Sequence, residues 1–344
     1  MARRVFAATA LAAGAWASAS CAPGGFRDET NIAGVRVMAS QASPPYAHPG
    51  DPVSLDVLAA DGRISKPEPM QVYWLPFVCE NPVGDAYYAC FQPGARLLPA
   101  GSAGSAGPGL LRMPPGTALP LDPGTKFAFS MPADAVKTHA QVPGTPVPYG
   151  IVYLFNIACA GHIELLPLDP HDDNPVQIPF GCFDQAHHLL GPDDYVFGFT
   201  RVYALDTVTN ANPVIDHIDV EGKTVDLAQG FTTPPCTASK SANCAKVHIG
   251  PVVPKDSWEL NPEINDAHGQ PLHEQIWADF YSTFGQFDNS ARLLYDPATG
   301  SLGGPDKTDG AFVPPPVAGD GTIWIVVHDN RGGAAWAAVP VHVK

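Results

Sequence analysis

Alternation of apolar and polar side chains is the strongest pattern in this sequence, and it predicts β-strands. It is clearest over residues 276–284, where the two faces carry Ile276, Ala278, Phe280, Ser282 and Phe284 against Trp277, Asp279, Tyr281 and Thr283. Successive side chains of a strand point to opposite faces, so this spacing predicts a strand with one buried face. No stretch of twelve or more residues has the 3.6-residue apolar period that would predict an amphipathic helix.

The same reasoning predicts strands along the whole chain. They are expected at 36–41, 53–60, 71–78, 126–131, 149–159, 195–206, 276–284, 322–328 and 335–343, with a fresh strand starting at Ile215. We expect 149–159 and 195–206 to form one hairpin, and the last two strands another. The second pair is joined by 329–333, where Asn and Gly accept the positive φ of a tight turn.

Residues 71–78 are predicted to form one buried central strand around Trp74. Two segments interrupt the strand pattern: residues 93–124 are predicted to form a mobile Gly/Ser/Pro/Ala-rich excursion, and residues 160–194 a long polar loop. The chain has 38 Pro and 33 Gly, which suits many short strands joined by turns. The predicted fold class is therefore all-β, with two immunoglobulin-like β-sandwich domains in tandem. The first spans 32–209 with long loop insertions, and the second spans 210–344.

A family resemblance supports this prediction. The second domain resembles the immunoglobulin-like modules of bacterial surface proteins, including polycystic-kidney-type and cadherin-like repeats, at 212–215 (NPVI), 280–288 (FYSTFGQFD), 322–333 (TIWIVVHDNRGG) and 339–343 (VPVHV). The first domain resembles the opening of such a module at Arg36, Pro49-Gly50 and Leu55. Both lack the Cys–Trp–Cys spacing of antibody domains, so we expect their cysteines to close loops.

The N-terminus predicts export. Arg3 and Arg4 precede an apolar run over 5–17, which is too short to span a bilayer and makes 1–20 a secretory signal peptide. Residues 18–21 (SASC) resemble the bacterial lipobox, although Ser18 stands where that motif has a large aliphatic residue. The resemblance implies that Cys21 carries a lipid and that 21–31 is a tether. Ala22 implies the outer membrane as the destination. The alternative is ordinary cleavage nearby, with Cys21 a spare thiol.

The other cysteines predict disulfides. The chain has 7 cysteines, and setting Cys21 aside leaves six in three local pairs, as expected in an oxidising compartment. Proximity alone predicts the pairs Cys79–Cys90, Cys159–Cys182 and Cys236–Cys244. A metal–thiolate cluster is the alternative, but the sequence contains no C-x-x-C.

Charge limits the partners. The chain has 34 acidic against 19 basic residues, a net charge of −15. This excludes nucleic acid, whose binding depends on Lys and Arg, and it leaves membrane attachment to the lipid anchor. A protein or glycan partner stays open. Four aromatic residues are predicted to stack on sugar rings if they face solvent, or else to fill space between sheets: Trp277, Tyr281, Trp324 and Trp336.

Catalytic motifs are missing from the sequence, so we expect a non-enzymatic protein without a cofactor. There is no nucleophile elbow or phosphate-binding loop, and Trp277 replaces the second histidine of an H-E-x-x-H pattern that begins at His273. The rival function is a metal-dependent envelope enzyme or a calcium-binding adhesin that uses the 160–194 loop.

That loop gathers carboxylates and imidazoles around Cys159 and Cys182. Such groups supply oxygens to Ca²⁺ or nitrogens to Zn²⁺, whereas the simpler interpretation is a solvated loop whose Asp and Asn residues cap turns. The loop residues in question are His162, Glu164, Asp169, His171, Asp172, Asp173, His187, His188, Asp193 and Asp194. The densest part, a weak Ca²⁺ candidate without the spacing of an EF-hand, holds Asp169, His171, Asp172 and Asp173.

Overall fold

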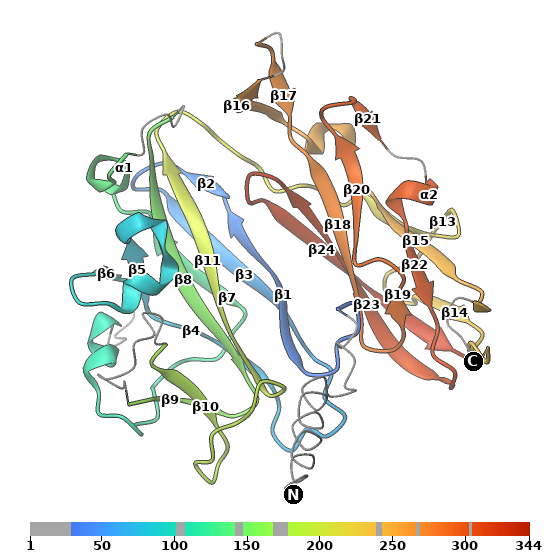
Figure 1. Cartoon of the computed structure of the whole chain (residues 1–344), viewed down its shortest axis with the longest axis horizontal. Helices are drawn as coiled ribbons and strands as arrows, with labels where there is room; N and C mark the ends of the chain where they lie inside the picture. Colours follow the sequence, from blue (N-terminus) through green and yellow to red (C-terminus); the bar gives the residue numbers. More distant parts are fainter. Residues whose placement is uncertain are drawn as a thin grey trace, which may run out of the picture.

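The fold is built almost entirely of β-strands (Figure 1), which confirms the predicted all-β class. This computed structural model describes residues 29–100, 107–141, 147–167, 178–238, 243–265, 269–302 and 305–344. No helix in these ranges is long and apolar enough to cross a membrane. The predicted signal peptide at 1–20 and the lipid site at Cys21 lie outside the described residues.

Two facing sheets form the first sandwich. One has the order β1-β3-β7, and the other has the order β2-β11-β8-β5-β6, with β4 also paired to β8. The strands are β1 (Val35–Ser43), β2 (Tyr46–Ala47), β3 (Pro52–Asp61), β4 (Gln71–Trp74), β5 (Phe77–Glu80), β6 (Arg96–Pro99), β7 (Lys126–Ser130), β8 (Tyr149–Cys159) and β11 (Tyr195–Leu205). The predicted hairpin is confirmed, since β8 pairs with β11 along its whole length. The core between the sheets packs Leu55 of β3 against Val152 and Leu154 of β8.

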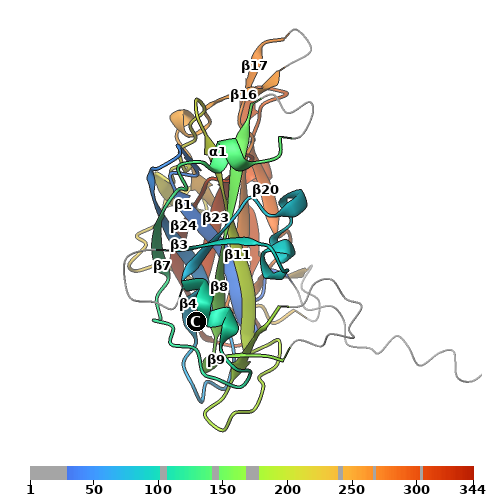
Figure 2. The same cartoon turned by 90° about the vertical axis from the view of Figure 1, so that its left-hand side faces the viewer.

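The central strand β8 is buried on both faces. Its second face, with Phe155 and Ile157, packs under a cover that Figure 2 shows in front of β8 and β11. The cover consists of η2 (Tyr87–Phe91), η3 (Gly107–Arg112), β9 (His162–Leu165) and β10 (Phe180–Phe183). The other two short helical turns of this sandwich are η1 (Val83–Asp85) and α1 (Ala135–Thr138). A strand buried on both sides explains the near-continuous apolar run of 149–159.

The second sandwich follows after residues 206–216. Its sheets have the orders β13-β12-β15-β22-β19 and β14-β24-β23-β18-β20-β21, and a hairpin arm of β16 and β17 projects beyond them (Figure 1). The elements are β12 (His217–Val220), β13 (Lys223–Thr224), β14 (Phe231–Thr233), β15 (Val247–Val252), η5 (Lys255–Ser257), β16 (Leu260–Asn265), β17 (Pro271–His273), β18 (Ile276–Ser282), β19 (Gln286–Phe287), β20 (Ala291–Asp296), β21 (Ser301–Leu302), α2 (Pro305–Thr308), β22 (Gly310–Val313), β23 (Gly319–Asp329) and β24 (Ala334–Val343). The buried face of β18 is the predicted one, with Ile276, Ala278 and Phe280 in the core. The predicted β23–β24 hairpin is also confirmed. No described sheet mixes strands from the two sides of 206–216, and the boundary near 209–213 stays a prediction.

The two sandwiches pack against each other face to face. Val326, on the outer face of β23, is fully buried against Met38 and Ala39 of β1 and Ala60 of β3. Three of the four aromatic residues considered for sugar stacking pack into this cluster instead: Tyr281, Trp324 and Trp336. These three side chains are partly buried there, which is the space-filling alternative, and Trp277 stacks on His328 with ring centres 5.2 Å apart. The segment before β1 adds to the interface, because the amide of Ile32 donates to the carbonyl of Ser282 at 2.8 Å.

Four local predictions differ from the structure. Residues 71–78 form two strands, because Pro76 has no amide hydrogen and the chain bends between β4 and β5. Residues 93–124 contain β6 and η3 rather than only a mobile excursion, since Leu110 of η3 is buried in the apolar cluster between the cover and β8. The 160–194 segment includes the β9–β10 hairpin. The strand expected from Ile215 begins at His217.

Candidate functional site

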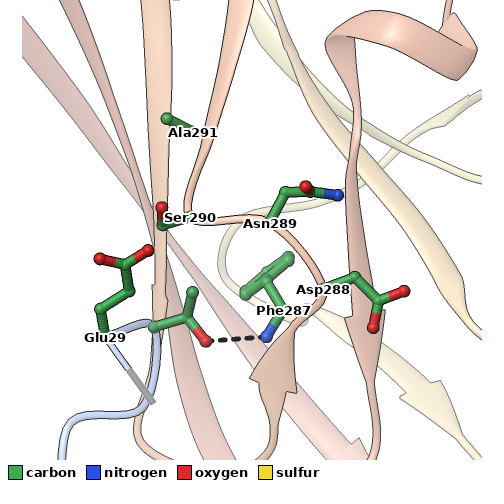
Figure 3. Close-up of a pocket in the computed structure, with 7 residues that line it drawn as sticks. Glu29, Phe287, Asp288, Asn289, Ser290 and Ala291 are labelled. Atoms are coloured by element: carbon green, nitrogen blue, oxygen red, sulfur yellow. Dashed lines mark hydrogen bonds between the residues drawn. The ribbon is translucent and has the colours of Figure 1, made fainter. Parts of the chain in front are cut away.

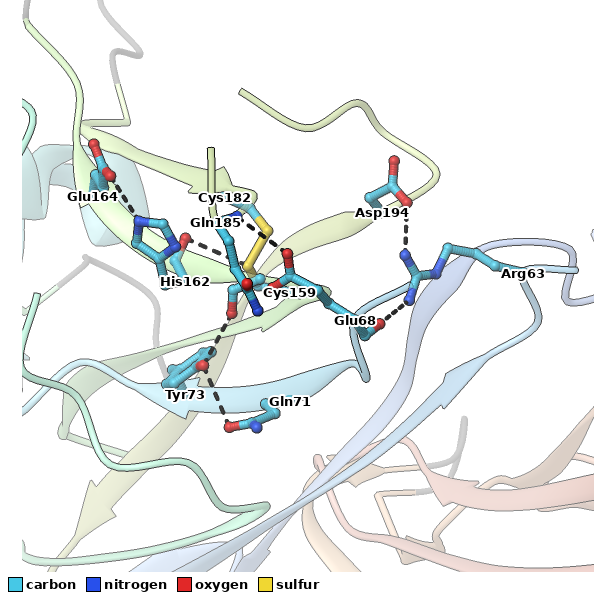
Figure 4. The surroundings of a disulfide bond; sticks show 11 residues. Arg63, Glu68, Gln71, Tyr73, Cys159, His162, Glu164, Cys182, Gln185 and Asp194 are labelled. Carbon is cyan, nitrogen blue, oxygen red and sulfur yellow. Dashed lines mark hydrogen bonds and ion pairs between the residues drawn. A yellow bond between two sulfur atoms is a disulfide. The ribbon is translucent and has the colours of Figure 1, made fainter. Parts of the chain in front are cut away.

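The three predicted disulfides are confirmed. Their Cα–Cα distances are 5.8 Å for Cys79–Cys90, 5.8 Å for Cys159–Cys182 and 5.4 Å for Cys236–Cys244. All three close local loops, which indicates a protein matured in an oxidising, extracytoplasmic compartment. The Cys159–Cys182 bond ties the end of β8 to β10, and the residues around it form the candidate site (Figure 4).

Strand β9 places two chemical groups on one face. His162 and Glu164 are two residues apart on this strand, so their side chains point the same way. The backbone of β9 is held from both sides: it pairs with β10, and on its other edge Leu119 donates its amide to the carbonyl of Ile163 at 2.8 Å. As a result Glu164 is only 3% exposed.

A tight turn after β10 brings a third group to this face. Asp184 organises the turn, since its Oδ1 accepts the amides of Ala186 at 2.8 Å and of His188 at 2.9 Å. This is the local capping that short carboxylate side chains favour in turns. His187 then takes a φ of 61°, a left-handed conformation uncommon for residues other than glycine. The turn thereby directs the imidazole of His187 back toward β9.

Two imidazoles meet on one carboxylate oxygen. Oε1 of Glu164 lies 2.7 Å from Nε2 of His162 and 2.6 Å from Nδ1 of His187. Figure 4 shows the first of these contacts beside the disulfide. Burial acts to raise the pKa of Glu164, but the hydrogen bonds from the two histidines outweigh it and hold that pKa below its usual value. The carboxylate is therefore ionised at neutral pH.

This arrangement differs from the other histidine–carboxylate pairs. His342 with Asp320 and His139 with Asp85 each bring one imidazole to one carboxylate. Over the described ranges, His162, Glu164 and His187 are the one group of three such side chains whose ligand atoms lie within 4.8 Å of one another. Two imidazole nitrogens and one carboxylate oxygen form a donor set that proteins use for Zn²⁺ and related ions.

The remaining loop residues from the sequence prediction are spread apart. Asp169, His171, Asp172 and Asp173 lie outside the described residues. His188 pairs with Asp184 at 3.1 Å, and Asp194 pairs with Arg63 at 2.8 Å. The sequence placed His162, Glu164 and His187 in the loop but did not single them out. The alternation of polar and apolar residues over 162–165 was the signal that the first two share a face.

A polar pocket lies elsewhere, where residues 29–30 meet the second sandwich (Figure 3). It is lined by Glu29, Thr30, Phe287, Asp288, Asn289, Ser290 and Ala291. The amide of Phe287 donates to Oγ1 of Thr30 at 2.9 Å, and Asp288 pairs with Lys246. Its polar groups fasten the N-terminal segment to the sandwich, and its lining holds neither histidine nor cysteine.

Comparisons with known proteins add no family. No protein-family model and no curated protein matches the sequence. Among solved structures, the D0–D1 domain of intimin is similar at 9% identity over 89% of this chain and 98% of that chain, with a TM-score of 0.20. Escherichia coli α2-macroglobulin activated by porcine elastase has 12% identity over 93% of this chain and 22% of that chain, with a TM-score of 0.20. Latent PorU from Porphyromonas gingivalis has 11% identity over 91% of this chain and 24% of that chain, also with a TM-score of 0.20. Similarities at this level carry no conclusion about fold or function.

Proposed function

We propose that this chain is a non-enzymatic lipoprotein of the bacterial cell envelope, with a binding or structural role. The observation that carries the proposal is the set of three disulfides, which fits an exported, oxidised protein. The signal-like start and the lipobox-like residues ending at Cys21 add the export route and the anchor. Several acyl chains on one cysteine give stable attachment, so the acidic surface is no obstacle to membrane anchoring.

The packing of the two sandwiches supports a scaffold role. The outer face of β23 is buried on the first sandwich, so the linker is not the only connection between them. The side chains of Gln41 and Asn212 add hydrogen bonds across this junction. The side-chain amide of Asn212 donates to the backbone carbonyl of Ala42 at 2.8 Å. A stiff pair of sandwiches holds its end loops in a fixed arrangement relative to one another. The projecting β16–β17 arm is one element it presents to a protein or glycan partner.

Detergent partitioning of the protein expressed in a Gram-negative host tests the anchor. We expect the mature protein in the detergent phase and a Cys21→Ser variant in the aqueous phase, because only the cysteine sulfur accepts the lipid. Ser18→Leu is the matched control: it supplies the large aliphatic residue of the lipobox and should leave the protein in the detergent phase. Equal aqueous solubility of the exported wild-type and Cys21→Ser proteins would contradict the proposal.

A further inference from the structure

We propose that His162, Glu164 and His187 bind a divalent first-row transition-metal ion, with Zn²⁺ as the reference ion. The inference goes beyond the envelope role, because it assigns a ligand to the first sandwich and does not depend on the lipid anchor. It rests on three side chains that two separate elements, the strand β9 and the turn after β10, bring to one point.

The distances suit a bound ion after a small adjustment. A tetrahedral Zn²⁺ site with bonds of about 2.0–2.1 Å keeps its ligand atoms roughly 3.3 Å apart. The imidazole nitrogens of His162 and His187 lie 2.7 and 2.6 Å from the Glu164 oxygen, slightly closer than this spacing, and all three ligand atoms lie within 4.8 Å of one another. The side chain of His187 is 66% exposed at the tip of its turn, which leaves it free to make this adjustment.

The chemistry of the donors selects the class of ion. Two imidazoles and one carboxylate match the ligands of Zn²⁺ and its neighbours, whereas Ca²⁺ requires about six to eight oxygens. In the present arrangement each ring donates a hydrogen bond to Glu164. A metal ion takes the same ring nitrogens, and each imidazole then carries its proton on its other nitrogen.

The surroundings hold the ligands in place without closing the site. The buried Glu164 is fixed by strands on both sides of β9, and the Cys159–Cys182 bond anchors the base of the hairpin. Asp184 fixes the turn that carries His187. Three protein ligands beside an exposed tip leave a coordination position for water or for a group of a partner molecule, as in other three-ligand zinc sites.

Direct titration tests the site. The mature protein is purified in detergent, stripped with a chelator and titrated with Zn²⁺ against a chromophoric zinc chelator. We expect stoichiometric binding of one ion, with Ca²⁺ and Mg²⁺ unable to compete. His187→Asn should weaken Zn²⁺ binding at least about tenfold, since altering even supporting residues of metal sites costs that much. Asn tolerates the left-handed φ of this position, so the turn should persist and the metal-free melting temperature should fall only by the loss of the hydrogen bond to Glu164.

Two further variants make the result decisive. Glu164→Gln should weaken Zn²⁺ binding as His187→Asn does. His342→Asn removes the imidazole that lies 2.6 Å from Asp320 in the second sandwich, and it should leave the affinity unchanged. Wild-type affinity in His187→Asn would place any bound ion elsewhere in the chain and overturn the proposal. So would a wild-type protein that binds no Zn²⁺ at millimolar concentration, or one that binds Ca²⁺ equally well.

Discussion

Arg331 of the second sandwich packs on Tyr46 of the first, with the guanidinium carbon 4.8 Å from the centre of the ring. The same guanidinium donates to Oε1 of Glu274 at 2.7 Å and to the carbonyl of Thr209 at 2.6 Å. It therefore joins both sandwiches and the segment between them. Arg331 lies in the β23–β24 turn, which the sequence indicated only as a tight turn, and it is 4% exposed.

The first prediction concerns the buried ion pair. Replacing Arg331 with Met should destabilise the protein by about 3 kcal/mol at pH 8, because it leaves the carboxylate of Glu274 buried without its partner. The double variant Arg331→Met/Glu274→Met should recover much of this loss, since the unpaired carboxylate of Glu274 is removed with its partner. Chemical denaturation measures both values. A double variant no more stable than the single one would contradict this account of the pair.

The second prediction is a pH dependence. Burial and the nearby Asp329 raise the pKa of Glu274 from 4.5 to about 7, against the opposing effect of Arg331. The folded state therefore binds a proton more tightly than the unfolded state, so this group stabilises the fold at low pH. That contribution is lost as the pH rises from about 4.5 through 7, by up to a few kcal/mol.

Melting temperatures of the wild-type and Glu274→Gln proteins between pH 5 and pH 8 test this dependence. Gln keeps a hydrogen-bond acceptor for Arg331 and does not titrate. The wild-type protein should lose stability relative to the variant as the pH rises. Parallel curves for the two proteins would show that Glu274 does not titrate in this range.

The third prediction concerns the interface between the sandwiches. Val326→Asp should separate them, because it buries an unpaired carboxylate between β23 and β1. We expect faster proteolysis within 206–216 while both sandwiches stay folded. Val317→Asp is the matched control, since it introduces the same carboxylate at a side chain that is 59% exposed. Equal cleavage rates for the two variants would argue against the interface.

The fourth prediction compares two disulfides. Removing Cys159–Cys182 should cost about 1 kcal/mol more than removing Cys236–Cys244, because the sequence separations are 23 and 8 and the entropic gain grows with loop length. Both sulfurs of the first bond are also fully buried, so the paired Ala replacements leave a cavity. Unfolding of the two double variants in denaturant measures the difference. A larger loss for Cys236–Cys244 would contradict it.

Strands with strong local patterning could be predicted from the sequence. The predicted 149–159 matches β8, and the predicted face of β18 is the buried one. The exceptions depend on contacts distant in sequence. Residues 71–78 have the apolar pattern of one strand, but the chain bends at Pro76 between the two segments that pair with β8. The composition of 93–124 gives no sign that Leu110 packs into the apolar cluster between the cover and β8.

The candidate site could be predicted only in part. The alternation of polar and apolar residues predicts that His162 and Glu164 share a face. The composition of the loop predicts that carboxylates and imidazoles are concentrated there. The position of His187 beside these two residues depends on a turn that Asp184 caps and on the pairing of β10 with β9. Neither is marked in the sequence, because the β9–β10 strands are only 4 residues long and the second begins beyond a polar stretch.

The central claim, a lipid-anchored envelope protein, is tested most directly by the mass of the mature chain. Intact-protein and N-terminal peptide mass spectrometry of the membrane-purified protein should show a chain that starts at Cys21. That residue should carry the added mass of a diacylglyceryl group, and the other six cysteines should be oxidised. A mature chain that starts elsewhere, or one whose Cys21 is an unmodified thiol, would contradict the account.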